Sequence, residues 1–323
     1  MVTSAIADPV PVTALNFARA ETDMYFSRFV ARGGLGKFDH NRTPTPIDKQ
    51  DVIRMNRDTL YSAVVFDLDA APVTITLPDA GKRFMSLVLI NEDHYVINTV
   101  YAPSSMTGTR EQAGTGYVVA LVRTFVNADD PADVQAANAA QDAVTIEQAK
   151  TGMFEVPQWD PVTHEKAREA LLSLAALGGI QEPRFGRKDE VEPISWLLST
   201  ASGWGGNPQR DALYLPMFPR ISDGRAAYAL KVKDVPVDGF WSITMYDAKG
   251  FMFENGQEAY SLNNVTAKAD ADGTVSIQFG GAPKAASNFL PITPGWNYLV
   301  RLYRPRREIL DGSWKFLEAQ PVK

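Results

Sequence analysis

Three neighbouring residues in the first half of the chain, Glu92, Asp93 and His94, combine the groups that acid–base chemistry requires. A histidine beside a carboxylate can act as a general base whose ring the carboxylate orients. Arg54 adds a guanidinium that could hold an anionic part of a substrate. We therefore interpret Arg54, Asp93 and His94 as candidate catalytic residues. The alternative for residues 92–94 is an ordinary exposed turn.

Amide and aromatic side chains form a second group of candidates. Aromatic rings stack on the apolar faces of sugars and amides serve hydroxyl groups, so this combination suits a sugar or another polar, uncharged ligand. The candidate ligand-binding residues are Asn56, Trp204, Asn207, Tyr246, Tyr260, Asn263 and Asn264. The alternative for Tyr246 is a position in the core of a β-sandwich. Our hypothesis places four of the candidates in one cavity at a domain junction: Arg54, Asn56, Tyr260 and Asn264.

The familiar catalytic and metal-binding signatures are missing from the sequence. It contains no G-x-S-x-G elbow, no H-E-x-x-H motif, no P-loop and no G-x-G-x-x-G that opens a helix. The chain has no cysteine and three histidines, so thiolate chemistry is excluded and a three-histidine metal site would need all of them to converge. His164 is expected at the surface, in the first turn of a helix. We expect neither a metal nor a cofactor.

Charge and hydropathy narrow the range of partners. A net charge of −6 does not favour binding to nucleic acid, which requires a basic surface. No run approaches the roughly 20 apolar residues that cross a bilayer. The first residues lack the basic and apolar regions of a signal peptide, so the chain is expected to be cytoplasmic or a mature exported protein. A small-molecule ligand or substrate is the partner that remains.

Three segments of the first half recur in order in the second half, which indicates a duplicated β-rich domain. The matched segments are 57–61 with 210–214, 84–87 with 240–243, and 117–123 with 298–304. Polar residues that both copies share are better explained by common architecture than by a single site. Arg57 and Asp58, which match Arg210 and Asp211, are therefore interpreted as structural.

The hydrophobic pattern predicts which elements position these residues. A helix is expected over residues 11–32 and a bent strand, carrying Arg54 and Asn56, over residues 51–68. Asp-Pro pairs at 130–131 and 160–161 predict two further helices, which end near 150 and 178. Short strands with tight turns fill the rest and predict antiparallel β-sandwiches or jelly rolls.

We therefore expect a mainly β, α+β protein in three segments. Residues 1–128 would form the N-terminal helix and first sandwich, residues 129–182 a helical connector, and residues 183–323 the second sandwich. The open edges of the sheets make a homodimer possible.

The chain resembles bacterial proteins that pair a domain of unknown function 1254, at the N-terminus, with a domain of unknown function 1214, at the C-terminus. The motifs that carry the resemblance are Arg54-Met-Asn-Arg-Asp-Thr-Leu-Tyr61, Gly203-Trp-Gly-Gly-Asn207, Phe240-Trp-Ser-Ile243, Tyr260-Ser-Leu-Asn-Asn264 and Gly295-Trp-Asn-Tyr298. The resemblance covers nearly the whole chain. It implies a β-rich two-domain protein of a kind that bacteria frequently export, and no particular activity.

Two functions fit these observations. The first is an enzyme, a hydrolase or a lyase, that acts on a small polar molecule in a cleft between or within the sandwiches. The second is a non-catalytic protein that binds carbohydrates or similar small ligands, which the missing catalytic motifs favour.

Overall fold

A computed structural model describes residues 8–50, 53–282 and 288–322 of the chain. It confirms the mixed α+β fold, with four β-sheets among the described residues. The chain divides into two compact units, each assembled from separate stretches of sequence. Unit 1 comprises residues 1–40, 61–123 and 140–208, and unit 2 comprises residues 41–60, 124–139 and 209–323.

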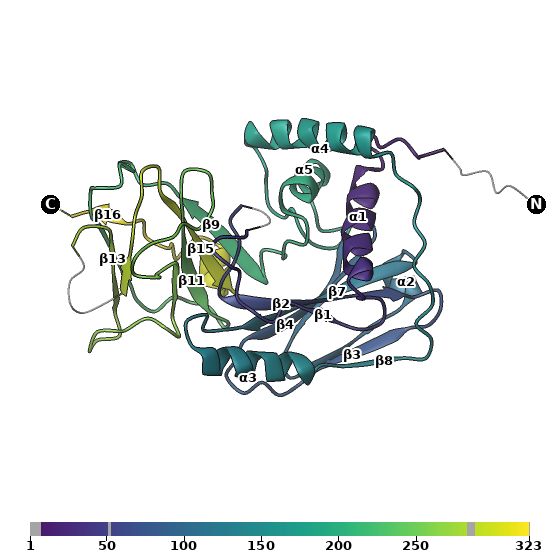
Figure 1. The fold of residues 1–323 in the computed structure, drawn as a ribbon, viewed down its shortest axis with the longest axis horizontal. Helices are drawn as coiled ribbons and strands as arrows, with labels where there is room; N and C mark the ends of the chain where they lie inside the picture. The colour runs from purple at the N-terminus through teal and green to yellow at the C-terminus, as the bar shows by residue number, and fades with distance from the viewer. Residues whose placement is uncertain (1–7, 51–52, 283–287, 323) are drawn as a thin grey trace, which may run out of the picture. The chain divides into compact units, whose positions relative to one another are not determined.

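Unit 1 is built on a main sheet that is covered on both faces (Figure 1). Its strand order is β1 (Asp39–His40), β2 (Thr59–Asp67), β7 (Tyr117–Phe125), β4 (Met85–Asn91) and β5 (Val96–Tyr101). Successive side chains of a strand point to opposite faces. Leu87 and Leu89 of β4 therefore pack towards the smaller sheet, whereas Val88 and Ile90 pack with Phe26 of the N-terminal helix. This explains why every residue of β4 is buried.

The smaller sheet of unit 1 has the order β6 (Ser104–Gly108), β3 (Val73–Leu77) and β8 (Thr145–Gln148). Strand β8 lies where the sequence predicted a helix continuing to about residue 150. Helix α3 (Pro131–Asp142) ends earlier, and the β-branched pair Thr145 and Ile146 then joins β3 in an antiparallel ladder.

The longer helices of unit 1 gather on the other face of the main sheet (Figure 1). They are α1 (Phe17–Ala31), α4 (Pro161–Ala176) and α5 (Pro193–Gly203). The short α2 (Arg110–Ala113) follows β6, and its Ala113 packs instead in the core that faces the smaller sheet. Helix α4 starts as predicted, because the side chain of Asp160 accepts hydrogen bonds from the backbone N–H groups of Val162 and Thr163. Among the described residues, no helix is both long enough and apolar enough to span a bilayer.

Unit 2 encloses its core between two sheets. One has the order β12 (Ser261–Asn263), β11 (Trp241–Tyr246), β15 (Asn297–Tyr303) and β9 (Ala212–Met217). The other has the order β14 (Asn288–Leu290), β13 (Val275–Phe279), β10 (Tyr228–Val232) and β16 (Gln320–Pro321). Large aromatic side chains fill the space between them, among them Trp296, Phe279 and Tyr298. The short helix α6 (Arg307–Leu310) follows β15.

The strand orders confirm the internal duplication. The series β2, β7, β4, β5 corresponds to β9, β15, β11, β12, and the series β6, β3, β8 corresponds to β13, β10, β16. Equivalent backbone hydrogen bonds run from Val126 N–H to the oxygen of Asp58 and from Arg304 N–H to the oxygen of Asp211. Arg301 is thereby the structural equivalent of Arg123, three residues away from the match that the sequence suggested.

The stretch before β2 differs from the prediction. Residues 51–52 lie outside the described part of the chain, and residues 53–58 form turns and irregular backbone instead of a strand. Arg54 has a φ of +57°, in the left-handed region that a strand excludes. Arg54 and Asn56 therefore do not share a strand face.

Candidate active site

A pocket of about 590 Å³ lies between α1 and the first half of α4, within unit 1. Residues three and four apart on a helix lie on one face, and α1 turns such a face towards the pocket, with Asp23 and Arg28 on it. Helix α4 contributes His164 and Arg168. Trp159, from the segment that leads into α4, also lines the pocket. The volume falls in the range of about 300–1,000 Å³ that is usual for small-molecule sites.

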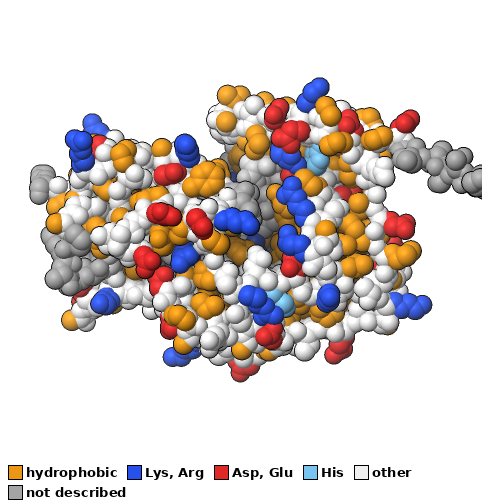
Figure 2. Space-filling model, in the orientation of Figure 1, with side chains coloured by type: hydrophobic (Ala, Val, Ile, Leu, Met, Phe, Trp, Pro, Cys, Tyr) orange, Lys and Arg blue, Asp and Glu red, His pale blue; other side chains and the backbone are white. Residues whose placement is uncertain are grey.

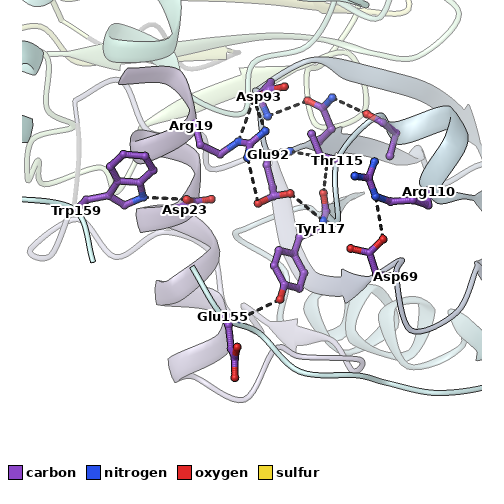
Figure 3. Close-up of polar contacts among 12 residues, drawn as sticks. Arg19, Asp23, Asp69, Glu92, Asp93, Arg110, Thr115, Tyr117, Glu155 and Trp159 are labelled. Atoms are coloured by element: carbon purple, nitrogen blue, oxygen red, sulfur yellow. Dashed lines mark hydrogen bonds and ion pairs between the residues drawn. The ribbon is translucent and has the colours of Figure 1, made fainter. Parts of the chain in front are cut away.

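Asp23 is the most perturbed acid on the pocket wall. Its side chain is buried, its Oδ2 accepts a hydrogen bond of 2.9 Å from Nε1 of Trp159, and its Oδ1 has no partner within the described parts of the chain (Figure 3). Burial raises the pKa of Asp23 to about 7; the Trp159 hydrogen bond opposes this rise, and the charge of Glu92 adds to it. A carboxyl group with such a pKa can both donate and accept a proton at neutral pH.

Arg19 pairs with two further carboxylates, Glu92 and Asp93. It lies one helical turn before Asp23, and its Nε and Nη2 donate to Oδ1 of Asp93 at 3.0 and 2.7 Å (Figure 3). Its Nη1 lies 3.8 Å from Oε1 of Glu92. Glu92 is buried, which raises its pKa, although the N–H of Tyr117 donates to its Oε2 at 3.0 Å and opposes the rise. The cluster thus surrounds Asp23 with negative charge that a single arginine offsets.

His164 is buried against a glutamate, contrary to the expected surface position. Its Nε2 lies 2.7 Å from Oε2 of Glu21 and 3.4 Å from Nη2 of Arg168. The shorter contact is the stronger, and a carboxylate only accepts, so Nε2 carries the proton and Nδ1 keeps its lone pair. Arg168 holds the same glutamate through two hydrogen bonds, of 3.2 and 2.6 Å. Glu21 thereby orients a histidine that can accept a proton at Nδ1.

The predicted base His94 is buried elsewhere in unit 1, at the β4–β5 turn, with both ring nitrogens engaged. Gly205 N–H donates to its Nε2 at 2.8 Å, so Nδ1 carries the proton and lies 2.8 Å from Oγ1 of Thr200. Burial lowers the pKa of His94 to about 3, which keeps the ring neutral. The exposed turn that served as the alternative is wrong for His94, whose side chain is only 1% exposed.

Two of the predicted ligand-binding residues, Trp204 and Asn207, lie at and just after the end of α5, and Trp204 is half-buried. The Trp204 ring stacks on Tyr25 at 4.2 Å and on His94 at 5.5 Å, and its Nε1 donates to Oγ1 of Thr22. The Trp204 ring therefore packs between α1 and the β4–β5 turn. Asn207 is buried.

The amides predicted in unit 2 bond to neighbouring protein groups. Asn56 donates to Thr59 Oγ1 and Tyr303 Oη, both at 2.9 Å. Asn263 donates to Oδ1 of Asp58 at 3.0 Å, and Asn264 accepts from Trp241 N–H at 2.9 Å. These bonds fix loops and strand ends. They leave fewer amide groups for the hydroxyls of a ligand.

The aromatic candidates of unit 2 pack against arginines. The ring of Tyr260 lies 5.2 Å from the guanidinium of Arg57. Tyr246 is fully buried, as its core alternative proposed, and its hydroxyl donates to the backbone oxygen of Met55 at 2.7 Å. The shared cavity of Arg54, Asn56, Tyr260 and Asn264 stays a prediction.

The sequence reasoning missed Glu21, Asp23 and His164, although two signals were present. The run Glu21-Thr22-Asp23 places two acidic residues in the middle of a helix, and all three residues are buried. Buried carboxylates in a helix are rare unless they are paired. The Asp160-Pro161 helix start also places a tryptophan and a histidine within five residues of each other.

Comparisons with known proteins support the fold and leave the activity open. The chain is similar to the crystal structure of the VPA0106 protein from Vibrio parahaemolyticus, with a TM-score of 0.69 and 18% sequence identity. The superposition covers 96% of this chain and 100% of the VPA0106 chain. The chain also superposes on 87% of an uncharacterized protein from Burkholderia cenocepacia, with a TM-score of 0.53 and 14% identity. No curated protein matches the chain.

Two family models match the sequence. Residues 35–113 match the protein of unknown function family DUF1254, and residues 220–307 match the protein of unknown function family DUF1214. The chain therefore belongs to the proteins that combine an N-terminal DUF1254 domain with a C-terminal DUF1214 domain.

Proposed function

We propose that the protein is an enzyme that performs acid–base chemistry on a small polar molecule in the pocket between α1 and α4. The observation that carries the proposal is the position of Asp23, a buried carboxyl with a pKa of about 7, on the wall of that pocket. Perturbed acids in concave sites are typical of catalytic centres. His164, oriented by Glu21, supplies a second group that can accept a proton.

In a hydrolase or a lyase, His164 would act as the general base and Asp23 as the general acid. In hydrolysis, water loses a proton to Nδ1 of His164 as its oxygen attacks the substrate, and protonated Asp23 gives its proton to the leaving group. In elimination, the same nitrogen takes a proton from carbon while Asp23 protonates the departing group. Arg28, whose guanidinium lies 5.3 Å from the Tyr25 ring, provides a positive charge for an anionic part of the substrate.

Turnover by the purified full-length protein tests the proposal. A mixture of small polar metabolites is incubated with the wild type, and consumed compounds are identified by mass spectrometry. We expect Asp23→Asn and His164→Asn each to lower turnover by about 100-fold or more, the usual contribution of a general acid or base. Glu169→Gln, an exposed carboxylate of the same helix, is the matched control and should retain activity. Incorporation of ¹⁸O from labelled water separates hydrolysis from elimination.

A binding function for carbohydrates is favoured by a different pocket of unit 1. This pocket, of about 620 Å³, is lined by amide, carboxylate and aromatic side chains that suit hydroxyl groups, including Asn98, Gln112, Asp93 and Tyr95. Calorimetric titration with mono- and disaccharides tests this alternative. Binding that Tyr95→Ala weakens, without any turnover in the metabolite mixture, would favour the alternative over the enzyme.

A further inference from the structure

Arg54, in unit 2, has an unusual backbone and an unusual environment. Its φ of +57° places the residue in a backbone region that costs about 1 kcal/mol or more for residues other than glycine, because the Cβ lies close to the backbone there. The N–H of Arg54 donates to the oxygen of Gly250 at 2.8 Å, which fixes this conformation. Strained residues that the surrounding structure holds in place are concentrated at functional sites.

The guanidinium of Arg54 lies close to two aromatic rings. Its central carbon is 5.5 Å from the ring of Phe218 and 5.6 Å from the ring of Tyr246. A guanidinium that contacts aromatic rings through its face keeps the N–H groups at its edge for the paired hydrogen bonds that a carboxylate or phosphate forms in its plane. Phe218 is itself 67% exposed, so one side of this arrangement borders solvent.

No carboxylate of the described residues pairs with Arg54. Its Nη1 is buried without a hydrogen-bond partner in the described parts of the chain. Burial lowers the pKa of Arg54; Tyr246 opposes this effect, and the nearby Arg301 adds to it. Asp58, an acid of unit 2 that interacts with Arg301, accepts hydrogen bonds from Asn263 and Ser261.

Arg301, close to Arg54, differs from it because its guanidinium has several hydrogen-bond partners. It is 3% exposed, and it donates to Thr244 Oγ1 at 2.7 Å and to Tyr246 Oη at 2.8 Å. It also donates to the backbone oxygen of Arg54 at 2.8 Å. Two guanidinium groups therefore share one neighbourhood, and only one of them has its donors occupied. A partly buried cation without a partner favours an anion from solution, because removing its water is costly and a bound anion repays that cost.

We propose that Arg54, next to the rings of Phe218 and Tyr246, is a binding site for a small oxyanion, the carboxylate or phosphate group of a metabolite. The site lies in unit 2, whereas the pocket proposed for acid–base chemistry lies in unit 1. Each proposal is therefore tested by variants of different residues, and the failure of one does not contradict the other.

Thermal unfolding of the full-length protein with inorganic phosphate or with acetate tests the proposal. Sodium chloride keeps the ionic strength constant, so that general screening does not contribute. We expect a saturable rise in Tm with at least one anion, because a ligand that binds only the folded state stabilises it; the anion that acts identifies the source. Arg54→Gln should abolish the rise, and Arg54→Lys, which lacks the planar fork, should weaken apparent binding about tenfold. Arg225→Gln, an exposed arginine of unit 2, should respond as the wild type.

A measurement on the wild type alone covers the case in which the Arg54 variants do not fold. Phenylglyoxal modifies accessible arginines, and peptide mass spectrometry reports the extent at each position. Phosphate or acetate should slow modification of Arg54 several-fold and leave Arg225 unchanged. Equal rates at Arg54 with and without both anions, or a Tm response that Arg54→Gln retains, would overturn the proposal.

Discussion

At the scale of single residues, Asp23 makes a testable contribution to the pH dependence of stability. The pKa of Asp23 is about 7 in the folded chain, compared with an ordinary value of 3.8, which we take for the unfolded chain. The folded state therefore binds the proton more tightly than the unfolded state. The stabilisation is complete below about pH 4 and is lost as the pH rises towards 7, with a total on the order of 4 kcal/mol.

Asp23→Asn removes this dependence and keeps an acceptor for Trp159. Compared with the wild type, the variant should gain stability between pH 4 and pH 8, as measured by urea unfolding at several pH values. Parallel curves for the two proteins across this range would contradict the pKa assigned to Asp23.

Arg168 offers a comparison between a buried and an exposed ion pair on one side chain. It contacts Glu21, whose side chain is 2% exposed, and Glu165, whose side chain is 58% exposed. Glu21→Gln leaves Arg168 without its buried counter-charge and should lower the free energy of unfolding by about 3 kcal/mol. Glu165→Gln should cost less than about 1 kcal/mol, because solvent screens exposed pairs. Chemical denaturation of both variants gives the two values, and equal losses would contradict this assignment.

At the scale of elements, His94 links the β4–β5 turn to α5 and to the residues just after it, through its hydrogen bonds with Thr200 and Gly205. His94→Leu leaves Gly205 N–H and the Thr200 hydroxyl without their partner, and we expect a loss of about 3 kcal/mol. The depressed pKa of His94, about 3, predicts that its stabilising effect is present above pH 6.5 and lost as the pH falls from 6.5 towards 3.

Unfolding of the wild type and of His94→Leu at pH 7 and pH 4.5 measures both effects. The difference between the two proteins should shrink at the lower pH. A difference that stays constant, or a change in turnover without any change in stability, would instead favour a catalytic His94.

Local signals predicted elements well and long-range contacts poorly. The Asp160-Pro161 start of α4 could be predicted because its cap is formed by adjacent residues. The strand β8 could not, since residues 145–148 become a strand only by pairing with β3, about 70 residues earlier in the chain. The burial of His164 depends in the same way on Glu21, 143 residues away.

At the scale of the whole molecule, the duplicated sheets predict which buried arginines are equivalent. Arg123 and Arg301 are 5% and 3% exposed and occupy matching positions of β7 and β15. Arg123→Met and Arg301→Met should each destabilise the protein by about 3 kcal/mol, because both remove a buried group whose partners are then unpaired. Arg304→Gln, at the position that the sequence repeat matched to Arg123, should cost less than about 1 kcal/mol. Denaturant titrations of the three variants decide between the two alignments.

The repeat was visible in the sequence because equivalent strands and turns carry similar residue types, but the register of its third pair of segments, 117–123 with 298–304, was three residues off. This error in β15 changes which arginine is considered buried, and the backbone hydrogen bonds of Asp58 and Asp211 correct it. The distribution of surface charge does not indicate a particular class of binding partner. Figure 2 shows acidic and basic side chains interspersed on the face in view.

The duplicated sheets also separate the part of the fold that occurs twice from the part that carries the proposed chemistry. Strands β2 to β8 have counterparts in β9 to β16, and α1, α4 and α5 lie outside these two sets of strands. Glu21, Asp23, His164 and Arg168 all belong to α1 and α4. The proposed acid–base pocket is thus lined by helices, and the duplicated strands serve as the scaffold that carries them.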